Sequence, residues 1–144
     1  MPLPAHIVSL ITTAWDDGYP LLLAVNGPGG PVMGPKGSMI VFDESDPLHL
    51  AYLERTRGTI LDCLKRDPRV CIMYMNMKAQ RDGKMESGFL RFFGTAQLYE
   101  SGPMREAIFS KLHKREQEHM GADKGIGVLI RIDSATDIRG KPLG

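Results

Sequence analysis

The 144-residue sequence has few of the residues that build disulfide, redox or metal sites. Its only two cysteines, Cys63 and Cys71, form no CxxC pair and do not cluster with the four histidines. We interpret both as reduced thiols in the core, in preference to a redox or metal role. His113 and His119 are six residues apart, so they would not share a helix face as a metal pair spaced by four does. No metal site is expected.

Net charge and long apolar runs are also lacking. The 18 basic side chains nearly balance the 17 acidic ones, which gives no strong field toward nucleic acid or an acidic membrane, so any anion site must be local. No apolar run approaches the roughly 18 residues that span a bilayer. Residues 1–4 lack the basic region and apolar core of a secretory signal. We expect one cytoplasmic domain over residues 1–144, with no membrane partner.

Hydrophobic periodicity predicts a first helix over residues 4–17. Pro4 suits its first turn, and Gly18 suits the left-handed position after its end. The stripe that would form its buried face consists of Ile7, Leu10, Ile11, Ala14 and Trp15. On this pattern Trp15 is expected in the core and not as a platform for a cofactor.

Two further helices are predicted. One covers residues 56–67, where a narrow apolar stripe ends at Asp67, a residue that precedes a proline and so avoids helical angles. The other opens at Gly102-Pro103 and continues into a dense charged run at 111–118. We interpret that run as a solvated face.

Apolar and alternating runs predict strands at residues 20–26, 31–36, 38–42, 48–53, 70–77, 88–99 and 125–132. The run 70–77 is apolar on both alternating sets, so it should be a central strand covered on both faces. Gly94 interrupts another run and indicates a bulge or barrel bend. Because strands outnumber possible crossover helices, the sheet should be antiparallel. The expected fold class is α+β, a Greek-key barrel with about three flanking helices.

Residues 54–59, Glu-Arg-Thr-Arg-Gly-Thr, form the strongest candidate for a ligand site. They open a predicted helix directly after a predicted strand, where unpaired N–H groups and the positive end of the helix dipole favour an anion. Arg55 and Arg57 would add fork-shaped donors for phosphate oxygens. The alternative is a threonine cap beside two solvated arginines.

Other candidate motifs are weaker. Residues 34–38, Gly-Pro-Lys-Gly-Ser, do not form a phosphate loop, because a glycine separates the Lys from the Ser and a strand follows. Residues 121–127 precede a strand, whereas a dinucleotide-binding turn opens a helix. Arg91 stands between Leu90 and Phe92 in a predicted strand. The sequence leaves two interpretations of Arg91 open, a surface residue on an exposed face or a residue that contacts the substrate.

The order of these elements resembles the pyridoxamine 5′-phosphate oxidase-like FMN-binding split barrels over nearly the whole chain. The motifs that carry the resemblance are Pro35-Lys36-Gly37-Ser38, Glu54-Arg55-Thr56-Arg57-Gly58, Arg66-Asp67-Pro68-Arg69-Val70 and Phe92-Phe93-Gly94-Thr95-Ala96. The resemblance implies a split β-barrel, a homodimer, and FMN in a cleft between subunits. The chain departs from the oxidase itself, which places an Arg-Lys pair on the phosphate-binding helix where Gly58, Thr59 and Ile60 follow Arg57.

By this resemblance the phosphate would be held by Thr56 and Arg57, with Arg55 as a neighbour, and the flavin ring would lie along residues 33–38. The implied cofactor-binding set is Met33, Gly34, Pro35, Lys36, Gly37, Ser38, Tyr52, Arg55, Thr56 and Arg57. Lys36, beside the ring, would stabilise the anionic reduced flavin. FMN is the expected cofactor, with a deazaflavin or haem as alternatives.

Three classes of function remain open at this point. The first is an FMN-dependent oxidoreductase acting on an unidentified small molecule. The second is a non-enzymatic flavin-binding or electron-transfer protein, because the sequence has no Ser/His/Asp or paired-carboxylate constellation. The third is a barrel that stacks single-stranded nucleic acid on aromatic strands, which the balanced charge disfavours.

Overall fold

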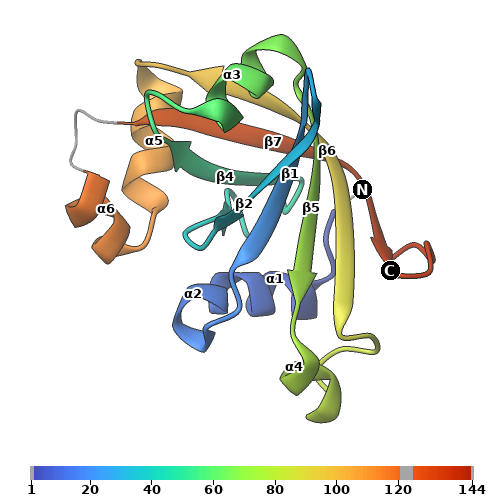
Figure 1. Ribbon diagram of the computed structural model, residues 1–144. Coiled ribbons are helices and arrows are strands. Elements are labelled where there is room, and N and C mark those ends of the chain that lie inside the picture. Colours follow the sequence, from blue (N-terminus) through green and yellow to red (C-terminus); the bar gives the residue numbers. More distant parts are fainter. Residues whose placement is uncertain (1, 121–124, 144) are drawn as a thin grey trace.

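The computed structural model describes residues 2–120 and 125–143, which form seven strands and six helices (Figure 1). The strands are β1 (Leu21–Gly27), β2 (Gly30–Lys36), β3 (Ile40–Val41), β4 (His49–Glu54), β5 (Arg69–Met75), β6 (Phe89–Tyr99) and β7 (Ile126–Asp137). The helices are α1 (Ala5–Thr12), α2 (Ala14–Asp17), α3 (Thr59–Arg66), α4 (Met77–Arg81), α5 (Pro103–Lys111) and α6 (Lys114–Met120). None of these helices is long and apolar enough to cross a membrane.

The strands form one antiparallel sheet in the order β2-β1-β5-β6-β7-β4-β3. Strands β4 and β5 follow each other in the chain but are separated in the sheet by β7 and β6, so the connection through α3 is a Greek-key crossover. The expected α+β antiparallel Greek-key split β-barrel is confirmed. The number of flanking helices was underestimated, because the structure has six within the described residues.

The predicted bend at Gly94 is confirmed by a register shift between Phe93 and Gly94 in the β6–β7 ladder. A Cβ atom at Gly94 would lie only 2.6 Å from the backbone oxygen of Arg131. Glycine is therefore required at this position, where the backbones of β6 and β7 approach each other closely.

The predicted helix over residues 4–17 is two helices that meet at Thr13. Thr13 has φ −98° and ψ 2°, and its hydroxyl donates to the backbone oxygen of Ser9 and to the carboxylate of Asp17. Such local bonds compete with regular helix geometry. Gly18 ends α2 in the left-handed region at φ 79°, as expected.

Other predicted boundaries shift for local reasons. Helix α3 begins at Thr59 and not at residue 56, because Gly58 has a φ of 148° that no helix accepts. The strand predicted at 38–42 contracts to β3 because Met39 N donates to Lys36 O in a turn. The strand predicted to end at 77 stops at Met75, and the side chain of Asn76 caps α4 by accepting from Ala79 N. Strand β7 runs on past residue 132 to Asp137.

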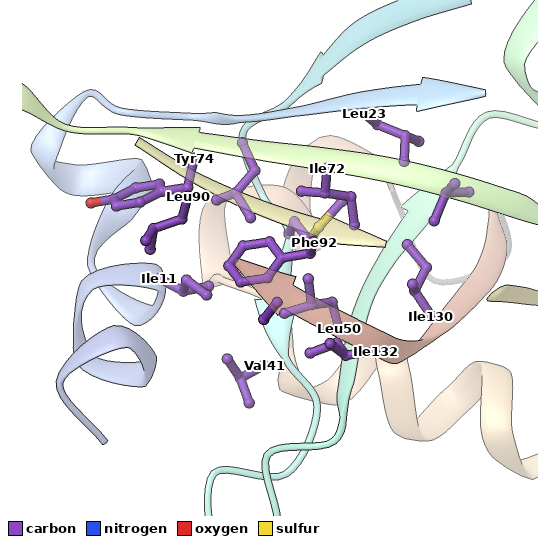
Figure 2. Packing of buried hydrophobic residues seen from close by; sticks show 14 of the residues in the cluster. Ile11, Leu23, Val41, Leu50, Ile72, Tyr74, Leu90, Phe92, Ile130 and Ile132 are labelled. Atoms are coloured by element: carbon purple, nitrogen blue, oxygen red, sulfur yellow. The ribbon is translucent and has the colours of Figure 1, made fainter. Parts of the chain in front are cut away.

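The main core lies between the inner face of the sheet and α1 (Figure 2). Ile11 of α1 faces Phe92 of β6 and Tyr74 of β5 there. A second cluster, formed by Ala51, Leu53, Ile108, Leu112 and Leu129, joins the outer side of β4 and β7 to α5. Strand β4 and the first half of β7 are therefore covered on both faces.

Within the single chain, the segment 70–77 is covered on one face and not on both, contrary to the prediction. Val70, Ile72 and Tyr74 point into the core, whereas Cys71 and Met73 are only half-buried and Met75 is 44% exposed. Within residues 2–120 and 125–143, no helix packs on this outer side as α5 packs on β4. The apolar side chains of β5 therefore face outward on one side. Both cysteines are free thiols; Cys63 is buried as expected and Cys71 only partly so.

Candidate functional site

A cleft of about 480 Å³ opens where β2 and β4 end. Helices α2 and α6 supply its other walls. It is lined by Trp15, Pro35, Lys36, Gly37, Ser38, Tyr52, Leu53, Glu54, Arg55, Arg115, Glu116, His119 and Met120. A smaller hollow of about 290 Å³ shares Arg55, His119 and Met120 with it and adds Thr56. The two hollows together extend the cleft toward the loop at residues 55–58. A cleft of this size suits a cofactor or small substrate.

A buried carboxylate organises the floor of the cleft. Glu54 ends β4 on the same face as Tyr52, because side chains two apart in a strand share a face. Its Oε2 lies 2.9 Å from Lys36 Nζ and accepts a 2.9 Å hydrogen bond from the Tyr52 hydroxyl. Its Oε1 accepts from Lys36 Nζ and from the backbone N–H of Arg55, each at 3.1 Å. Glu54 therefore satisfies three donors from β2, β4 and the following loop.

The floor is almost closed to water. The side chains of Lys36 and Glu54 are 17% and 7% exposed, and Lys36 Nζ lies 5.2 Å from the centre of the Tyr52 ring. Burial, followed by the nearby charge of Glu54, raises the pKa of the Tyr52 hydroxyl far above its usual value. Tyr52 therefore stays a neutral donor at physiological pH. The floor combines one cation and one anion, so its net charge is close to zero.

Trp15 forms an aromatic wall of the cleft. Its side chain is 42% exposed, so the expectation of a core position is wrong. A Cβ atom at position 37 would lie 2.4 Å from the Trp15 ring, which means that the ring rests directly on Gly37. The break at Thr13 turns α2 relative to α1 and separates Trp15 from the buried stripe. Trp15 is the only tryptophan of the chain, so its fluorescence reports on this cleft.

Helix α6 provides the wall that sequence reasoning missed. Arg115, Glu116, His119 and Met120 line the cleft, although the charged run was interpreted as a solvated face. The amide of Gln117 fixes the start of α6 by donating to the carbonyl oxygens of Ser110 and Leu112. Helix α6 buries none of its residues, so its periodicity carried no signal that it faces a cavity.

The loop at residues 55–58 leads from the cleft to the beginning of α3. Arg55, Thr56 and Arg57 are all exposed, and the structure gives neither guanidinium a hydrogen bond or ion pair with another described residue. Among the residues that the structure describes, no side chain caps the N-terminus of α3. Its first N–H groups therefore lack a protein side chain as a partner, and the adjacent charge is positive.

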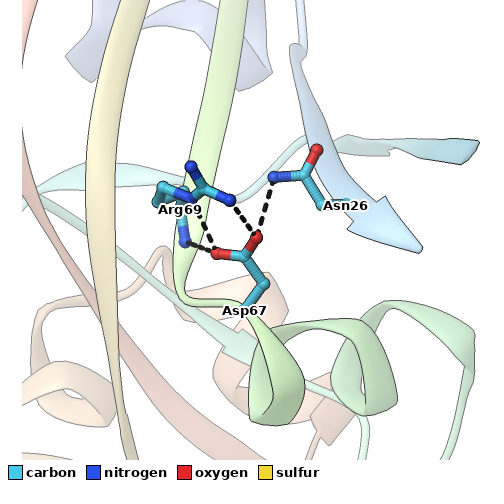
Figure 3. A network of polar contacts seen from close by, with 3 residues as sticks. All are labelled: Asn26, Asp67 and Arg69. Carbon is cyan, nitrogen blue, oxygen red and sulfur yellow. Dashed lines mark hydrogen bonds and ion pairs between the residues drawn. The ribbon is translucent and has the colours of Figure 1, made fainter. Parts of the chain in front are cut away.

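The far end of α3 is tied to the sheet by Asp67 (Figure 3). Its carboxylate accepts from the Arg69 guanidinium at 2.7 and 3.0 Å and from the Asn26 amide at 3.1 Å. The hydrogen bonds from Arg69 are the main cause of the low pKa of Asp67. These contacts with β1 and β5 fix the direction of α3, and with it the position of its N-terminus.

The structure brings together six of the residues singled out in the sequence: Pro35, Lys36, Gly37, Ser38, Tyr52 and Arg55 line the cleft. Thr56 lines the adjoining hollow. Gly34 faces Ile60 of α3, and Arg57 stands in the exposed loop beyond the cleft lining. Met33 and Arg91 belong to the outer face of the sheet, where Arg91 pairs with Met73. Neither lines the cleft of its own chain.

Glu54 belongs to the stretch 54–59 singled out in the sequence, but its role in the cleft floor was not foreseen, although the sequence carried a signal. It is the one charged residue in the run His49–Glu54, and strand alternation puts it on the face of Tyr52. No group of three or more His, Cys, Asp or Glu side chains in the described residues could hold a metal ion. His113 instead lies 3.7 Å from the carboxylate of Asp16.

The sequence matches no protein-family model and no curated protein. Solved structures do match. HupZ of Group A Streptococcus is 19% identical, with a TM-score of 0.70 over 99% of this chain and 98% of that one. A provisionally named pyridoxamine 5′-phosphate oxidase of Lactobacillus delbrueckii is 24% identical, with a TM-score of 0.61 over 87% and 89% of the chains.

A third match is a pyridoxamine 5′-phosphate oxidase-related, FMN-binding protein of Nostoc punctiforme. It is 17% identical, with a TM-score of 0.62 over 95% of this chain and 81% of that one. Further matches include a protein of the pyridoxinephosphate oxidase family from Clostridium acetobutylicum and an F420 reductase. At these identities the likeness establishes the fold. By its fold, this chain resembles the pyridoxamine 5′-phosphate oxidase-like proteins, as its sequence pattern indicated.

Proposed function

We propose that this protein binds FMN in the cleft between β2, β4 and α6 and acts as an oxidoreductase on a small molecule. The observation that carries the proposal is the cleft itself. It joins an aromatic wall, a polar floor and an arginine-bearing loop beside an uncapped helix N-terminus. The shared fold adds support, because one matched structure is named FMN-binding and another an F420 reductase.

The residues fit a ligand that is planar at one end and anionic at the other. Arg57, Thr56 and the first N–H groups of α3 would bind the phosphate, with Arg55 at the junction to the cleft. Pro35, Lys36, Gly37 and Ser38, the residues of the segment 33–38 that line the cleft, would lie against the flavin ring. The uncapped N-terminus of α3 is what makes this end suitable for a phosphomonoester.

FMN would supply the electron-transfer chemistry, and the protein would supply position and electrostatics. The floor presents fixed donors, because Glu54 holds both the Lys36 ammonium and the Tyr52 hydroxyl. Trp15 offers an apolar surface on which a planar ring can stack. Together they would orient the ring and limit the access of water to it.

We also propose that the protein is a homodimer, because the outer face of the sheet carries an uncovered apolar row. Strand register aligns Met33, Ala24, Cys71 and Phe93 across β2, β1, β5 and β6. Met33 and Phe93 are 62% and 45% exposed. Contiguous apolar patches of this kind mark interaction sites. A second copy that packs by two-fold symmetry would cover the row on both chains.

Fluorescence of Trp15 tests the proposed ligand. FMN absorbs at the wavelengths of tryptophan emission, so binding in the cleft should quench the single tryptophan. We expect saturable quenching at one FMN per chain, and at least about tenfold weaker binding of riboflavin, since each charge-assisted phosphate bond contributes about 1.5–3 kcal/mol. Coenzyme F420 in the same titration decides between the two flavin types. Absence of saturable quenching by either ligand would refute the proposal.

A further inference from the structure

We propose that Glu54 sets the charge of the cleft floor by neutralising Lys36. We further propose that this ion pair controls how tightly reduced FMN is held relative to oxidised FMN. The first statement concerns the protein alone, and the second rests on the proposed function. Both make Glu54 a positioning residue, since it acts on the cleft through Lys36 and Tyr52.

The geometry requires a charged Glu54. Its side chain is 7% exposed, and both oxygens accept hydrogen bonds, from the Lys36 ammonium, the Tyr52 hydroxyl and the Arg55 N–H. A buried carboxylate persists in its ionised form only when such partners offset its desolvation. Lys36 is the one cation among these donors, so the two charges compensate each other inside the cleft.

Removing the Glu54 charge and removing the Lys36 charge must therefore change the net charge of the cleft in opposite directions. Without the Glu54 charge, the Lys36 ammonium has no counter-ion in the floor, so the cleft becomes more positive and attracts anions more strongly. Without the Lys36 charge, the Glu54 carboxylate has no counter-ion in the floor, so the cleft becomes less positive and attracts anions less strongly. Removing both charges returns the floor to neutrality. If Glu54 acted only through packing, the two substitutions would not change the charge of the cleft with opposite signs.

Quenching of Trp15 by ions measures this charge without any cofactor, because Trp15 lines the same cleft. We expect Glu54→Gln to raise the ratio of iodide quenching to caesium quenching and Lys36→Met to lower it. The double variant should return close to the parent. Glu54→Asp keeps the charge and should stay near the parent. Glu100→Gln is the matched control, since Glu100 is exposed and does not line the cleft.

The second measurement is the reduction potential of bound FMN in the same variants. Two electrons and one proton convert neutral oxidised ring to the anionic reduced ring, with dithionite as the electron source. Glu54→Gln should favour the anionic form by about tenfold, which corresponds to about +30 mV for a two-electron couple. Lys36→Met should shift the potential by a similar amount in the negative direction.

The outcomes separate the two statements. Equal quenching ratios in Glu54→Gln, Lys36→Met and the parent would overturn the role of Glu54. If Glu54→Gln fails to fold, the comparison of Lys36→Met with the Lys36→Met/Glu54→Gln variant decides. The quenching ratio returns from the Lys36→Met value to the parent value only if the unpaired Glu54 charge caused the change in Lys36→Met. If the variants show the expected quenching ratios but the reduction potential of bound FMN does not change, the proposal that the ion pair controls the binding of reduced FMN would be overturned. A parent protein that binds no FMN would refute the proposed function, while the ion quenching still decides the role of Glu54.

Discussion

Replacing Arg57 by alanine should weaken FMN binding at least about tenfold, and adding Arg55→Ala should bring the loss to about a hundredfold. Each charge-assisted hydrogen bond to a phosphate contributes about 1.5–3 kcal/mol, and about 1.4 kcal/mol is a factor of ten in affinity. The two exposed guanidinium groups stand on the loop that leads into the uncapped N-terminus of α3. Titration of Trp15 fluorescence with FMN measures both losses.

Riboflavin and one further variant control this experiment. Riboflavin lacks the phosphate, so the Arg57→Ala protein should bind it about as well as the parent does. Arg66→Ala removes an exposed arginine from the other end of α3, where the dipole is negative, and should leave FMN binding unchanged. Equal losses for FMN and riboflavin would mean that Arg57 supports the fold and not the phosphate.

Replacing Phe93 by lysine should raise the dissociation constant of the homodimer by at least about a hundredfold. Phe93 lies in the apolar row that we propose as the interface, together with Met33 and Cys71. An unpaired ammonium buried in such an interface costs several kcal/mol, and about 1.4 kcal/mol is tenfold. The symmetric interface carries the change twice, once from each chain. Sedimentation velocity at micromolar concentration measures the effect.

Ser101→Lys is the matched control for that variant. Ser101 is exposed just beyond the end of β6, so it gains the same charge outside the apolar row. It should remain dimeric. A parent protein that is monomeric at micromolar concentration with flavin bound would contradict the dimer, and so would a Phe93→Lys protein that dimerises as well as Ser101→Lys.

Local chemistry made much of the fold predictable. The left-handed glycine at position 18, the proline that opens α5 and the bend at Gly94 each depend on one residue and its neighbours in sequence. The helix boundary at residue 56 failed for a related reason. Gly58 adopts a backbone conformation that excludes it from the helix, and a glycine in sequence does not reveal which conformation it takes.

Tertiary packing decided what the sequence could not. The run 70–77 and strand β4 are both apolar, but only β4 lies under α5 and is covered on both faces. Apolar composition alone does not say which partner, a helix or a second chain, covers an outer face.

The residues of the candidate site likewise divide into those that local sequence predicts and those that tertiary packing places. Residues 35–38 and Arg55 were found because they are small, basic or hydroxyl-bearing and stand at element ends. Trp15 and His119 come from helices distant in sequence, and they reach the cleft only through the break at Thr13 and the docking of α6. Helical periodicity distinguishes a core face from an exposed one, but it does not distinguish open solvent from the wall of a cleft.

The central claim is that the cleft holds a flavin, and the visible absorption spectrum of the freshly purified protein tests it most directly. We predict flavin absorption bands that co-elute with the protein in gel filtration, or that do so after incubation with FMN, at one flavin per chain. A spectrum without flavin bands after incubation with FMN and gel filtration would contradict the account.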